Sequence, residues 1–501
     1  MINFSKFRGQ NYINGRWADN PSKTDFFASL NPAHYEEIIG IFPKSGNQDI
    51  GEAVWAARKA FDNWRSLGMV RRAEFMKRLT RLLEDHHERI SRVVAREAGK
   101  QINEARADMT EAIHTTDYAA SVGVLGRRGE VVDLEVAGKD ASSKLVPRGV
   151  AVCISPWNFP IAIPFWEMAL TLIYGNTVIF KPSEDTPACG EIIASLMHEA
   201  GFPPGVFNML HGDGATGWHL VNHPDTNVVI FTGSWEVGNK IKQEVAKHPH
   251  KICTIETGSK SSVIVLDDAS EDMAVTAGIL SAFKTAGQRC VSASRIIVGR
   301  KLFNRYLESF LAAARRIKVG DPLDDDVFYG PMINWPAVYK GQEFNEKARR
   351  RFKVLLDRND ESAPTKNGFW LMPFVYETEW KTPDDVLQEE PFSPHVAIIP
   401  ASDVEDAVRI YNDTSYGLSV AVITSDEANA NYVLENARYG LGYVNLPCIG
   451  ADVRLPFGGI GKSGNLIASA AGLVPAITHQ VAITRNRTKE IKMAQGLSSK
   501  V

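Results

Sequence analysis

Apolar residues recur at helical spacing over the first hundred positions of the chain. Between 50 and 67, alanines and Phe61 fall on one face of a helix, and between 70 and 98 a second stripe includes Leu79. Apolar positions three and four residues apart indicate amphipathic helices, and a glycine such as Gly99 commonly follows a helix end. The first hundred residues are therefore predicted to form two helices, 50–67 and 70–98.

From about residue 144 the pattern changes to short, wholly apolar runs separated by helix-like stretches. The runs are 149–154, 177–180, 206–210, 228–231 and 252–256, with helix-like stretches at 166–174 and 189–200. Continuous apolar runs are typical of parallel strands buried on both faces. Their alternation with helices predicts β-α-β units in an open parallel sheet.

A second alternating block extends from 262 to about 444. It contains the apolar runs 296–298 and 420–424 and a helix pattern over 302–317. The fold class predicted is therefore α/β, with two open parallel-sheet domains of similar size. The polar segment 130–145 and the tail after residue 480 are predicted to be outlying strands or arms.

Composition excludes several classes of protein. Of 501 residues, 44% are hydrophobic and 23% charged, with a formal net charge of −3, which fits a globular protein and argues against nucleic acid or a membrane surface as partner. The most apolar region, 149–180, is interrupted by prolines, Asn158 and Glu167, so no membrane span is expected. Five scattered cysteines and no signal-peptide pattern predict a cytoplasmic protein.

Two strand ends that open helices are candidates for phosphate binding. Residues 212–217 form a G-x-G-x-x-G pattern after a predicted strand, although a turn followed by a helix start is the plainer interpretation. The second candidate is 231–238, where Ser234 can cap a helix whose free N–H groups could bind a phosphate.

Cys290 is the candidate nucleophile among the five cysteines. It ends a glycine-containing turn between two apolar runs, and Arg289 beside it would favour the reactive thiolate. A packed thiol is the alternative. Glu256 closes a buried strand and is the candidate base. His219 and His223 have metal-ligand spacing but lack the accompanying glutamate, so no metal site is predicted.

These residues resemble the NAD(P)-dependent aldehyde dehydrogenases over nearly the whole chain. The matching segments are 12–17, 31–32, 156–160, 175–184, 201–208, 231–234, 256–258, 287–290, 389–392 and 456–459, in the family's order and spacing. The resemblance implies that Cys290 attacks the aldehyde carbon and that Asn158, together with the Cys290 N–H, stabilises the oxyanion. Glu256 would then activate the water that hydrolyses the thioester.

The resemblance also implies a set of cofactor contacts. Lys181 and Glu184 would hold the adenosine ribose, Gly233 and Ser234 the pyrophosphate, and Glu390 and Phe392, with Trp157 nearby, the nicotinamide ribose and ring. Because a carboxylate at the 2′-hydroxyl repels an extra phosphate, NAD is expected to be preferred and NADP possible.

The substrate is expected to be a small aldehyde, and the cues to its identity conflict. Phe159, Trp166 and Phe457 are predicted to line the pocket. Arg454 is either the cation for a carboxylated semialdehyde or a solvated loop residue. Residues 463–465 resemble the amino-acid semialdehyde branch, whereas 156–164 resemble the 2-oxoglutarate semialdehyde branch. Ser259 and Glu167 stand where the family commonly has Gly and Lys.

The family's organisation implies an NAD-binding domain of residues 1–127 and 149–256 and a catalytic domain of 257–473. Residues 128–148 and 474–501 would be oligomerisation strands, with a homodimer or homotetramer as the assembly. Three alternatives stay open at this point: a CoA-acylating semialdehyde dehydrogenase, a thiol hydrolase, and a non-catalytic scaffold that retains the fold.

Overall fold

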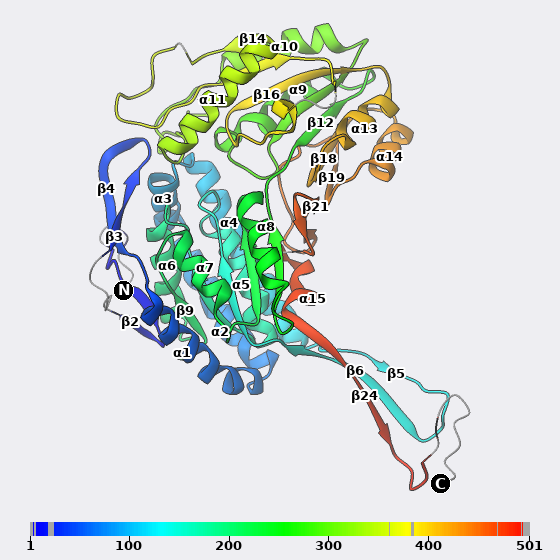
Figure 1. Ribbon diagram of the computed structural model, residues 1–501. Helices are drawn as coiled ribbons and strands as arrows, with labels where there is room; N and C mark the ends of the chain where they lie inside the picture. Colours follow the sequence, from blue (N-terminus) through cyan, green and yellow to red (C-terminus); the bar gives the residue numbers. More distant parts are fainter. Residues whose placement is uncertain are drawn as a thin grey trace.

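The chain forms two α/β bodies and a long antiparallel arm (Figure 1). The computed structural model describes residues 4, 7–18, 25–359, 361–381, 385–467, 469–491 and 493. The arm leaves the first body on the side away from the second. The predicted fold class, two largely parallel sheets in separate bodies, is confirmed.

The first sheet has eight strands in the order β2-β1-β9-β8-β7-β10-β11-β22. Its strands are β1 (Asn11–Ile13), β2 (Arg16–Ala18), β7 (Val150–Ile154), β8 (Thr177–Lys181), β9 (Phe207–Met209), β10 (Val228–Thr232), β11 (Ile252–Glu256) and β22 (Gly464–Asn465). The five central strands are parallel, and each is an apolar run read from the sequence. Antiparallel strands close both edges.

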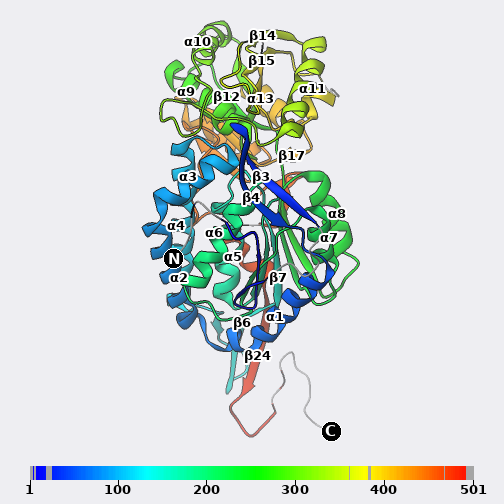
Figure 2. The same ribbon diagram turned by 90° about the vertical axis from the view of Figure 1, so that its left-hand side faces the viewer.

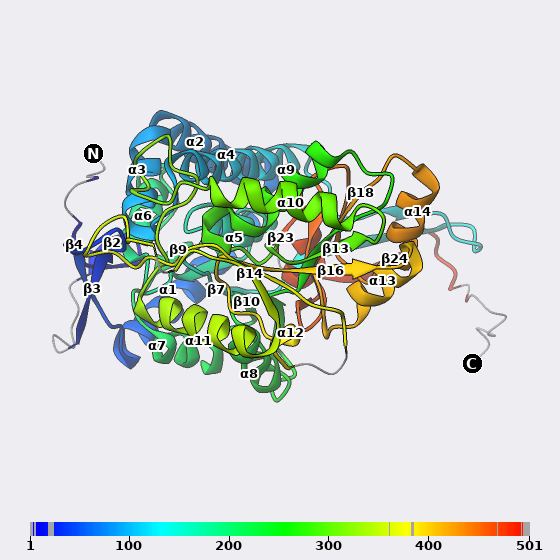
Figure 3. The same cartoon turned by 90° about the horizontal axis from the view of Figure 1, so that it is seen from above.

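Helices cover both faces of this sheet (Figure 3). One face carries α1 (Asn47–Ser66), α7 (Gly214–Asn222) and α8 (Trp235–Val245); the other carries α2 (Met69–Asp85), α3 (His87–Ala98), α4 (Ile102–Leu125), α5 (Ala162–Tyr174) and α6 (Pro187–Glu199). Successive residues of β7 alternate between the two cores, Val150 and Val152 on one side and Ala151 and Cys153 on the other. Burial on both faces explains why these strands are continuously apolar.

The prediction of a single helix over 70–98 is wrong at one point. The chain leaves helical geometry at His86 (φ −110°, ψ 8°), which divides the stretch into α2 and α3. Because α3 resumes at the next residue, the apolar stripe continues across the break and hides it from a periodicity argument. Helix α4 was not predicted, since 17 of its 24 residues are small or polar.

The second sheet has seven strands in the order β14-β15-β16-β13-β12-β18-β19. Its strands are β12 (Ser261–Val265), β13 (Ala293–Gly299), β14 (Lys353–Asp357), β15 (Phe374–Glu377), β16 (His395–Ala401), β18 (Ser419–Ile423) and β19 (Leu441–Val444). The helices around it are α9 (Glu271–Phe283), α10 (Phe303–Arg315), α11 (Trp335–Arg351), α12 (Asp385–Gln388), α13 (Val404–Asn412) and α14 (Glu427–Asn436). Only β14 runs antiparallel to its neighbour.

The two bodies exchange segments. The hairpin β3 (Phe26–Asn31) and β4 (His34–Pro43) reaches from the first body to the second (Figure 2), where Tyr35 stacks on Phe369 with ring centroids 5.4 Å apart. In return, the chain beyond β19 comes back to the first body. This returning segment contains the short strands β20 (Pro456–Phe457), β21 (Ile460–Gly461) and β23 (Ser469–Ala470), whereas the short strand β17 (Tyr416–Gly417) comes earlier in the chain, before β18. The segment continues into η2 (Ala471–Leu473) and α15 (Val474–Ile477), which bury Leu473 and Ile477 in the first core.

The arm consists of β5 (Val131–Val132), β6 (Lys139–Pro147) and β24 (Thr478–Asn486). Strands β6 and β24 pair antiparallel over their full length, from Pro147 opposite Thr478 to Lys139 opposite Asn486. The residues from 494 onward, included in the predicted arm, lie outside the described part of the chain. No described helix is long and apolar enough to cross a membrane. The domain boundaries stay a prediction.

Candidate active site

The candidate site lies where strands of the first sheet end, facing the second body. Asn158 follows β7, and the last residues of β10 and β11, Thr232 and Glu256, are direct partners in the parallel register. Partners in a parallel pair project to the same side of the sheet. The carboxyl edge of an open parallel sheet is also where such folds bind their ligands.

The loop that carries Cys290 has an unusual backbone. Thr285 and Ala286, in the short helix η1 (Lys284–Gly287), both have φ of 55°, and Gly287 follows with φ of 71°. A left-handed conformation costs roughly 1–2 kcal/mol for each non-glycine residue. At Gly287 a Cβ would lie 2.2 Å from the Ser393 carbonyl oxygen, so glycine is required. The surrounding protein therefore has to hold this loop in place.

Cys290 opens into a small pocket with apolar walls. The pocket has a volume of about 70 Å³ and is lined by Glu111, Phe159, Ile163, Trp166, Thr232, Glu256, Arg289, Cys290, Val291, Tyr443, Gly450, Ala451 and Phe457. Trp166 and Phe457 pack with ring centroids 4.7 Å apart. The structure thus brings together Cys290, Glu256 and three of the four predicted pocket residues, Phe159, Trp166 and Phe457.

Glu256 is almost completely buried beside this pocket. Its Oε2 accepts a hydrogen bond of 3.2 Å from the Gly459 N–H, and no described residue hydrogen-bonds its Oε1. Burial raises the pKa of Glu256 well above its usual value, opposed only by the Gly459 hydrogen bond. A raised pKa brings a carboxyl group into the range in which it can exchange protons near neutral pH.

The expectation that Arg289 holds Cys290 as a thiolate needs correction. Burial, followed by the negative charges of Glu256 and Glu390, raises the pKa of the Cys290 thiol, and Arg289 opposes this only weakly. The Arg289 guanidinium is hydrogen-bonded to Glu104. Cys290 is therefore protonated at rest, and its activation requires a base.

Asn158 is joined to the nucleophile loop. Its Nδ2 donates a hydrogen bond of 2.9 Å to the Gln288 carbonyl oxygen. The main-chain carbonyl oxygen of Asn158 accepts a hydrogen bond of 3.0 Å from Lys100 Nζ. An amide nitrogen has two N–H groups. One is used by Gln288, and the other is the donor that an oxyanion on the substrate would need.

A second cavity of about 250 Å³ lies on the other side of Cys290. It is lined by Pro156, Trp157, Asn158, Ile163, Thr232, Gly233, Ser234, Thr257, Gly258, Cys290, Ala337, Lys340, Glu390, Pro391 and Phe392. Five of the seven predicted cofactor residues are among them. At Gly258, a Cβ would lie 1.6 Å from Glu390 Oε2, so only glycine lets Glu390 occupy this place. The Ser259 N–H holds Glu390 Oε1 at 2.7 Å.

The other two predicted cofactor residues lie outside this cleft. Lys181 Nζ donates to Glu184 Oε2 at 3.1 Å and to the Gly212 carbonyl at 2.8 Å, beside the start of α7. Asp213 caps α7 with its own carboxylate, so the N–H groups of the G-x-G-x-x-G helix are partly used. At α8, Ser234 accepts from the Val237 N–H at 3.4 Å and borders the cleft, as expected for the preferred phosphate site.

Arg454 lies away from the pocket beside Cys290. It lines a broader outer cleft of about 900 Å³, formed by α4 and residues 450–454, and its guanidinium is paired with Asp452. The inner pocket and the outer cleft share Glu111, Phe159, Arg289, Gly450 and Ala451, so the two are continuous. Arg289 is therefore the arginine that borders the inner pocket.

Sequence reasoning did not place Glu111, Tyr443, Thr232 or Val291 in the pocket. Glu111 lies on α4, which was not predicted, and Tyr443 lies on β19, an edge strand that contributes one side chain to the pocket. Thr232 directly follows the apolar run 228–231, and the structure places it in register with Glu256, beside the candidate base.

Comparison with known proteins identifies the family. A model of the aldehyde dehydrogenase family matches residues 17–479. The chain belongs to the aldehyde dehydrogenase family. Among curated relatives of this aldehyde dehydrogenase, alpha-ketoglutaric semialdehyde dehydrogenase of Bacillus subtilis is 34% identical and covers 91% of this chain and 93% of its own length. Malonate-semialdehyde dehydrogenase of Lacticaseibacillus casei is 32% identical, covering 95% and 96%.

Solved aldehyde dehydrogenase structures share the fold. Betaine aldehyde dehydrogenase from Staphylococcus aureus, in complex with NAD+, superposes with a TM-score of 0.92 at 26% identity, covering 98% of this chain and 97% of that one. An aldehyde dehydrogenase structure from Burkholderia cenocepacia gives 0.92 at 29% identity, with coverages of 97% and 99%. The resemblance found in the sequence, including its leaning toward semialdehyde dehydrogenases, is confirmed.

Proposed function

We propose that this enzyme oxidises an aldehyde to a carboxylate through a covalent intermediate on Cys290. The aldehyde oxidation itself and the use of NAD(P) follow from the family and its NAD-complexed relatives. One observation supports the assignment of the residues. Cys290 lines both the small pocket beside Glu256 and the larger cleft that contains the predicted nicotinamide residues.

The first step is attack by sulfur. Glu256, in its ionised form, takes the thiol proton, and the Cys290 sulfur forms a bond to the aldehyde carbon while the carbonyl electron pair moves to oxygen. Asn158 Nδ2 and the Cys290 N–H stabilise that oxyanion in the thiohemiacetal. Since burial raises the pKa of Glu256, its carboxylate is a stronger base than an exposed one.

The second half of the reaction releases the acid. NAD(P), which Glu390 and Phe392 would hold in the cleft, would supply the acceptor for the hydride of the aldehyde carbon, so that a thioester remains on Cys290. Glu256 passes its first proton to solvent and then takes one from a water molecule. The water oxygen bonds to the thioester carbon, the C–S bond breaks to release the carboxylic acid, and Glu256 returns the proton to the departing Cys290 sulfur. A buried base in contact with the pocket favours water over CoA as the acyl acceptor.

We also propose that NAD is preferred and that the substrate carries a carboxylate. Glu184, held by Lys181, would repel a 2′-phosphate. Arg289 borders the inner pocket, and no described residue hydrogen-bonds its Nη1. Burial, followed by the charge of Asp108, raises the pKa of nearby Glu111 to about 8, so at neutral pH Glu111 is protonated and does not repel an anion. Both relatives named above are semialdehyde dehydrogenases.

The arm is proposed to join subunits in a homodimer or homotetramer. It projects away from both bodies, and Val131 and Val132 on it are exposed. Exposed strand edges pair readily with another chain. Light scattering of the full-length protein and of a variant with Val131 and Val132 replaced by Lys would test the assembly.

The enzyme assay follows NAD and NADP reduction by absorbance with paired aldehydes of equal length, one neutral and one ending in a carboxylate. We expect turnover with NAD and a lower KM for the carboxylated member. Cys290→Ala should bind NAD, measured by calorimetry, without reducing it. Oxidation that persists in Cys290→Ala contradicts the nucleophile assignment, and NAD reduction by neutral aldehydes alone contradicts the substrate class.

A further inference from the structure

The nucleophile loop is held in its left-handed conformation by a side chain from the other body. Glu104 lies on α4 and is only 5% exposed. Its Oε2 accepts from the Thr285 N–H at 3.2 Å, and its Oε1 accepts from Thr285 Oγ1 at 2.7 Å. One carboxylate thus grips both the backbone and the hydroxyl of a residue with positive φ.

The same carboxylate also holds the residue before the nucleophile. Arg289 Nη2 donates to Glu104 Oε1, and Arg289 Nε donates to Thr285 Oγ1 at 2.8 Å. Glu104, Thr285 and Arg289 therefore form a closed ring across the loop that ends at Cys290. Although burial raises the pKa of Glu104, the charges of Arg289 and Lys284 bring it below its usual value, so the carboxylate stays ionised and the ring stays charge-assisted.

One helical turn further along, α4 also holds the loop that carries Asn158. Asp108 Oδ1 accepts from the Ala162 N–H at 2.8 Å, and its Oδ2 accepts from the buried Lys100 Nζ at 3.2 Å. Lys100 also donates to the Asn158 carbonyl and lies 3.2 Å from the centre of the Phe159 ring. Glu104 and Asp108 are four apart on α4, so their carboxylates lie on the same face of the helix, and Lys100 lies in the turn that precedes it.

We propose that Glu104 is the positioning residue of Cys290: it fixes the sulfur against Asn158 by holding the Thr285–Arg289 turn to α4. The hydrogen bond from Asn158 Nδ2 to the Gln288 carbonyl completes the frame, because it joins the loop held by Glu104 to the loop held by Lys100 and Asp108. This inference rests on the proposed role of Cys290. Glu104 itself does not line the pocket or the cofactor cleft.

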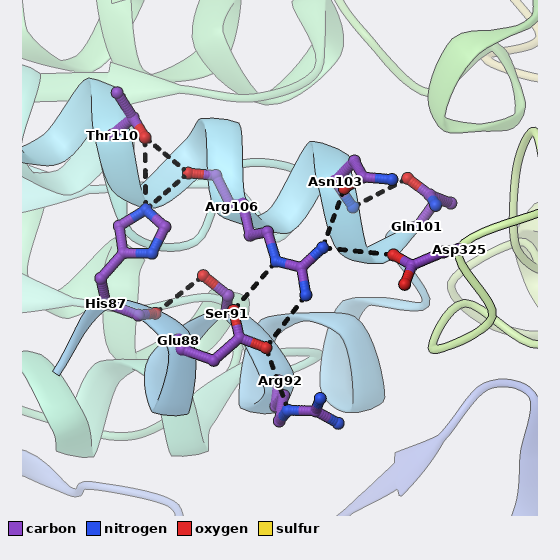
Figure 4. Close-up of polar contacts among 9 residues, drawn as sticks. All are labelled: His87, Glu88, Ser91, Arg92, Gln101, Asn103, Arg106, Thr110 and Asp325. Carbon is purple, nitrogen blue, oxygen red and sulfur yellow. Dashed lines mark hydrogen bonds and ion pairs between the residues drawn. The ribbon is translucent and has the colours of Figure 1, made fainter.

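The outer face of the same helix start provides a contrast (Figure 4). There Arg106 contacts Asn103, Asp325 and Glu88, and Glu88 also contacts Arg92, with His87 and Thr110 nearby. These groups are exposed; Glu88 and Asp325 show 48% and 70% of their side chains to solvent. Exposed pairs of this kind contribute little. Glu88→Gln is therefore a matched control for Glu104→Gln, since it removes the same charge from the same region.

The test compares Glu104→Gln, Glu88→Gln and Cys290→Ala as full-length enzymes, each checked by circular dichroism. For Glu104→Gln we expect kcat to fall about 10- to 100-fold, because small displacements of a reacting atom have effects of that size. The KM for the aldehyde and the Kd for NAD should change by no more than about twofold. Glu88→Gln should match the native enzyme in all three quantities.

A double variant separates positioning from general damage. Glycine adopts positive φ without penalty, so Ala286→Gly should let the loop keep its shape with less help from Glu104. We expect Glu104→Gln combined with Ala286→Gly to regain at least about threefold of the lost kcat.

Three outcomes overturn the proposal. A kcat in Glu104→Gln equal to that of Glu88→Gln would show that the carboxylate positions nothing. Equal losses in kcat and in NAD affinity, without rescue by Ala286→Gly, would show a general structural role. If Cys290→Ala still oxidises aldehyde, the nucleophile assignment fails and this inference with it, whereas a silent Cys290→Ala beside a fully active Glu104→Gln removes this inference alone.

Discussion

Two groups of buried carboxylates flank Cys290, and they differ in their partners. On the side toward α4, Glu104 accepts hydrogen bonds from Thr285 and Arg289 and lies near further cations. On the side toward the first sheet, Glu256 and Glu167 are buried with one hydrogen bond each to an oxygen, from the Gly459 N–H and from Thr232 Oγ1 respectively. One oxygen of each has no hydrogen-bond partner among the described residues.

The difference in partners separates two uses of a buried acid. Burial raises the pKa of Glu256 and Glu167 well above the usual value, whereas the cations around Glu104 outweigh its burial and bring its pKa below it. An ionised acid with fixed cationic partners can hold a backbone but has no proton to exchange. A buried acid without a cationic partner has a raised pKa, so it keeps a proton that it can exchange. Burial alone does not distinguish the two.

The largest effect expected from breaking this contrast is at Glu256. Glu256→Gln keeps the shape of the side chain but removes the base, so both thiol activation and thioester hydrolysis lose their proton acceptor. We expect turnover to fall by about 10²- to 10⁴-fold, the usual contribution of a general base. Steady-state and single-turnover NAD reduction would measure the two steps separately. Glu167→Gln, which alters a buried acid outside the two cavities, is the control.

The effect of pH on the free energy of unfolding should have opposite signs for the two groups of acids. Glu167 is neutral in the folded protein but ionises in the unfolded chain above about pH 4.3. As pH rises from there toward the raised folded pKa, only the unfolded state loses a proton, so the free energy of unfolding falls. In Glu167→Gln this fall in the free energy of unfolding is absent. Relative to the native protein it should therefore become progressively more stable as pH rises above about 5.

Glu104→Gln should behave in the opposite way. A lowered folded pKa contributes stability above the unfolded pKa, and this is lost as pH falls through the folded value. Removing one partner of a buried charged network costs about 3–5 kcal/mol, so the deficit should be largest at neutral pH and shrink in acid. Urea unfolding of both variants and the native protein across this range is the measurement. Curves that run parallel for the two variants would contradict the distinction.

The sequence predicted one side of this contrast better than the other. Glu256 was found because it closes a buried strand, and Cys290 because it ends a glycine-containing turn beside Arg289. Glu104, Lys100 and Glu111 were missed because they lie on or beside α4, whose small and polar residues gave no periodicity. The side chains of Lys100 and Glu104 bond to Asn158, Thr285 and Arg289, which are 58 to 185 residues away in sequence. Spacing along the chain carries no information about such contacts.

The outer acid of α4, Glu111, should have a smaller effect, confined to binding. Its pKa of about 8 means that it becomes negative as pH rises through that value, beside the arginine proposed to attract the substrate. We expect the KM of a carboxylated aldehyde to rise about three- to tenfold between about pH 7 and about pH 9, and Glu111→Gln to abolish the rise. A neutral aldehyde of equal length should show no change in KM. An identical rise for both aldehydes would argue against this role.

The smallest effect is expected at Ser259, which holds Cys290 by a neutral contact. Its hydroxyl donates to the Cys290 carbonyl oxygen and lies 2.8 Å from Ser261 Oγ. A neutral hydrogen bond contributes about 0.5–1.5 kcal/mol, and Glu104 would still hold the loop in a Ser259→Ala variant. We therefore expect kcat to fall only about two- to fivefold in Ser259→Ala, with Ser259→Gly close behind it. The Ser259 hydroxyl and the Glu104 carboxylate act on the same turn and differ chiefly in charge. Equal losses of kcat in Ser259→Ala and Glu104→Gln would therefore show that the charge of Glu104 gives it no advantage over a hydroxyl.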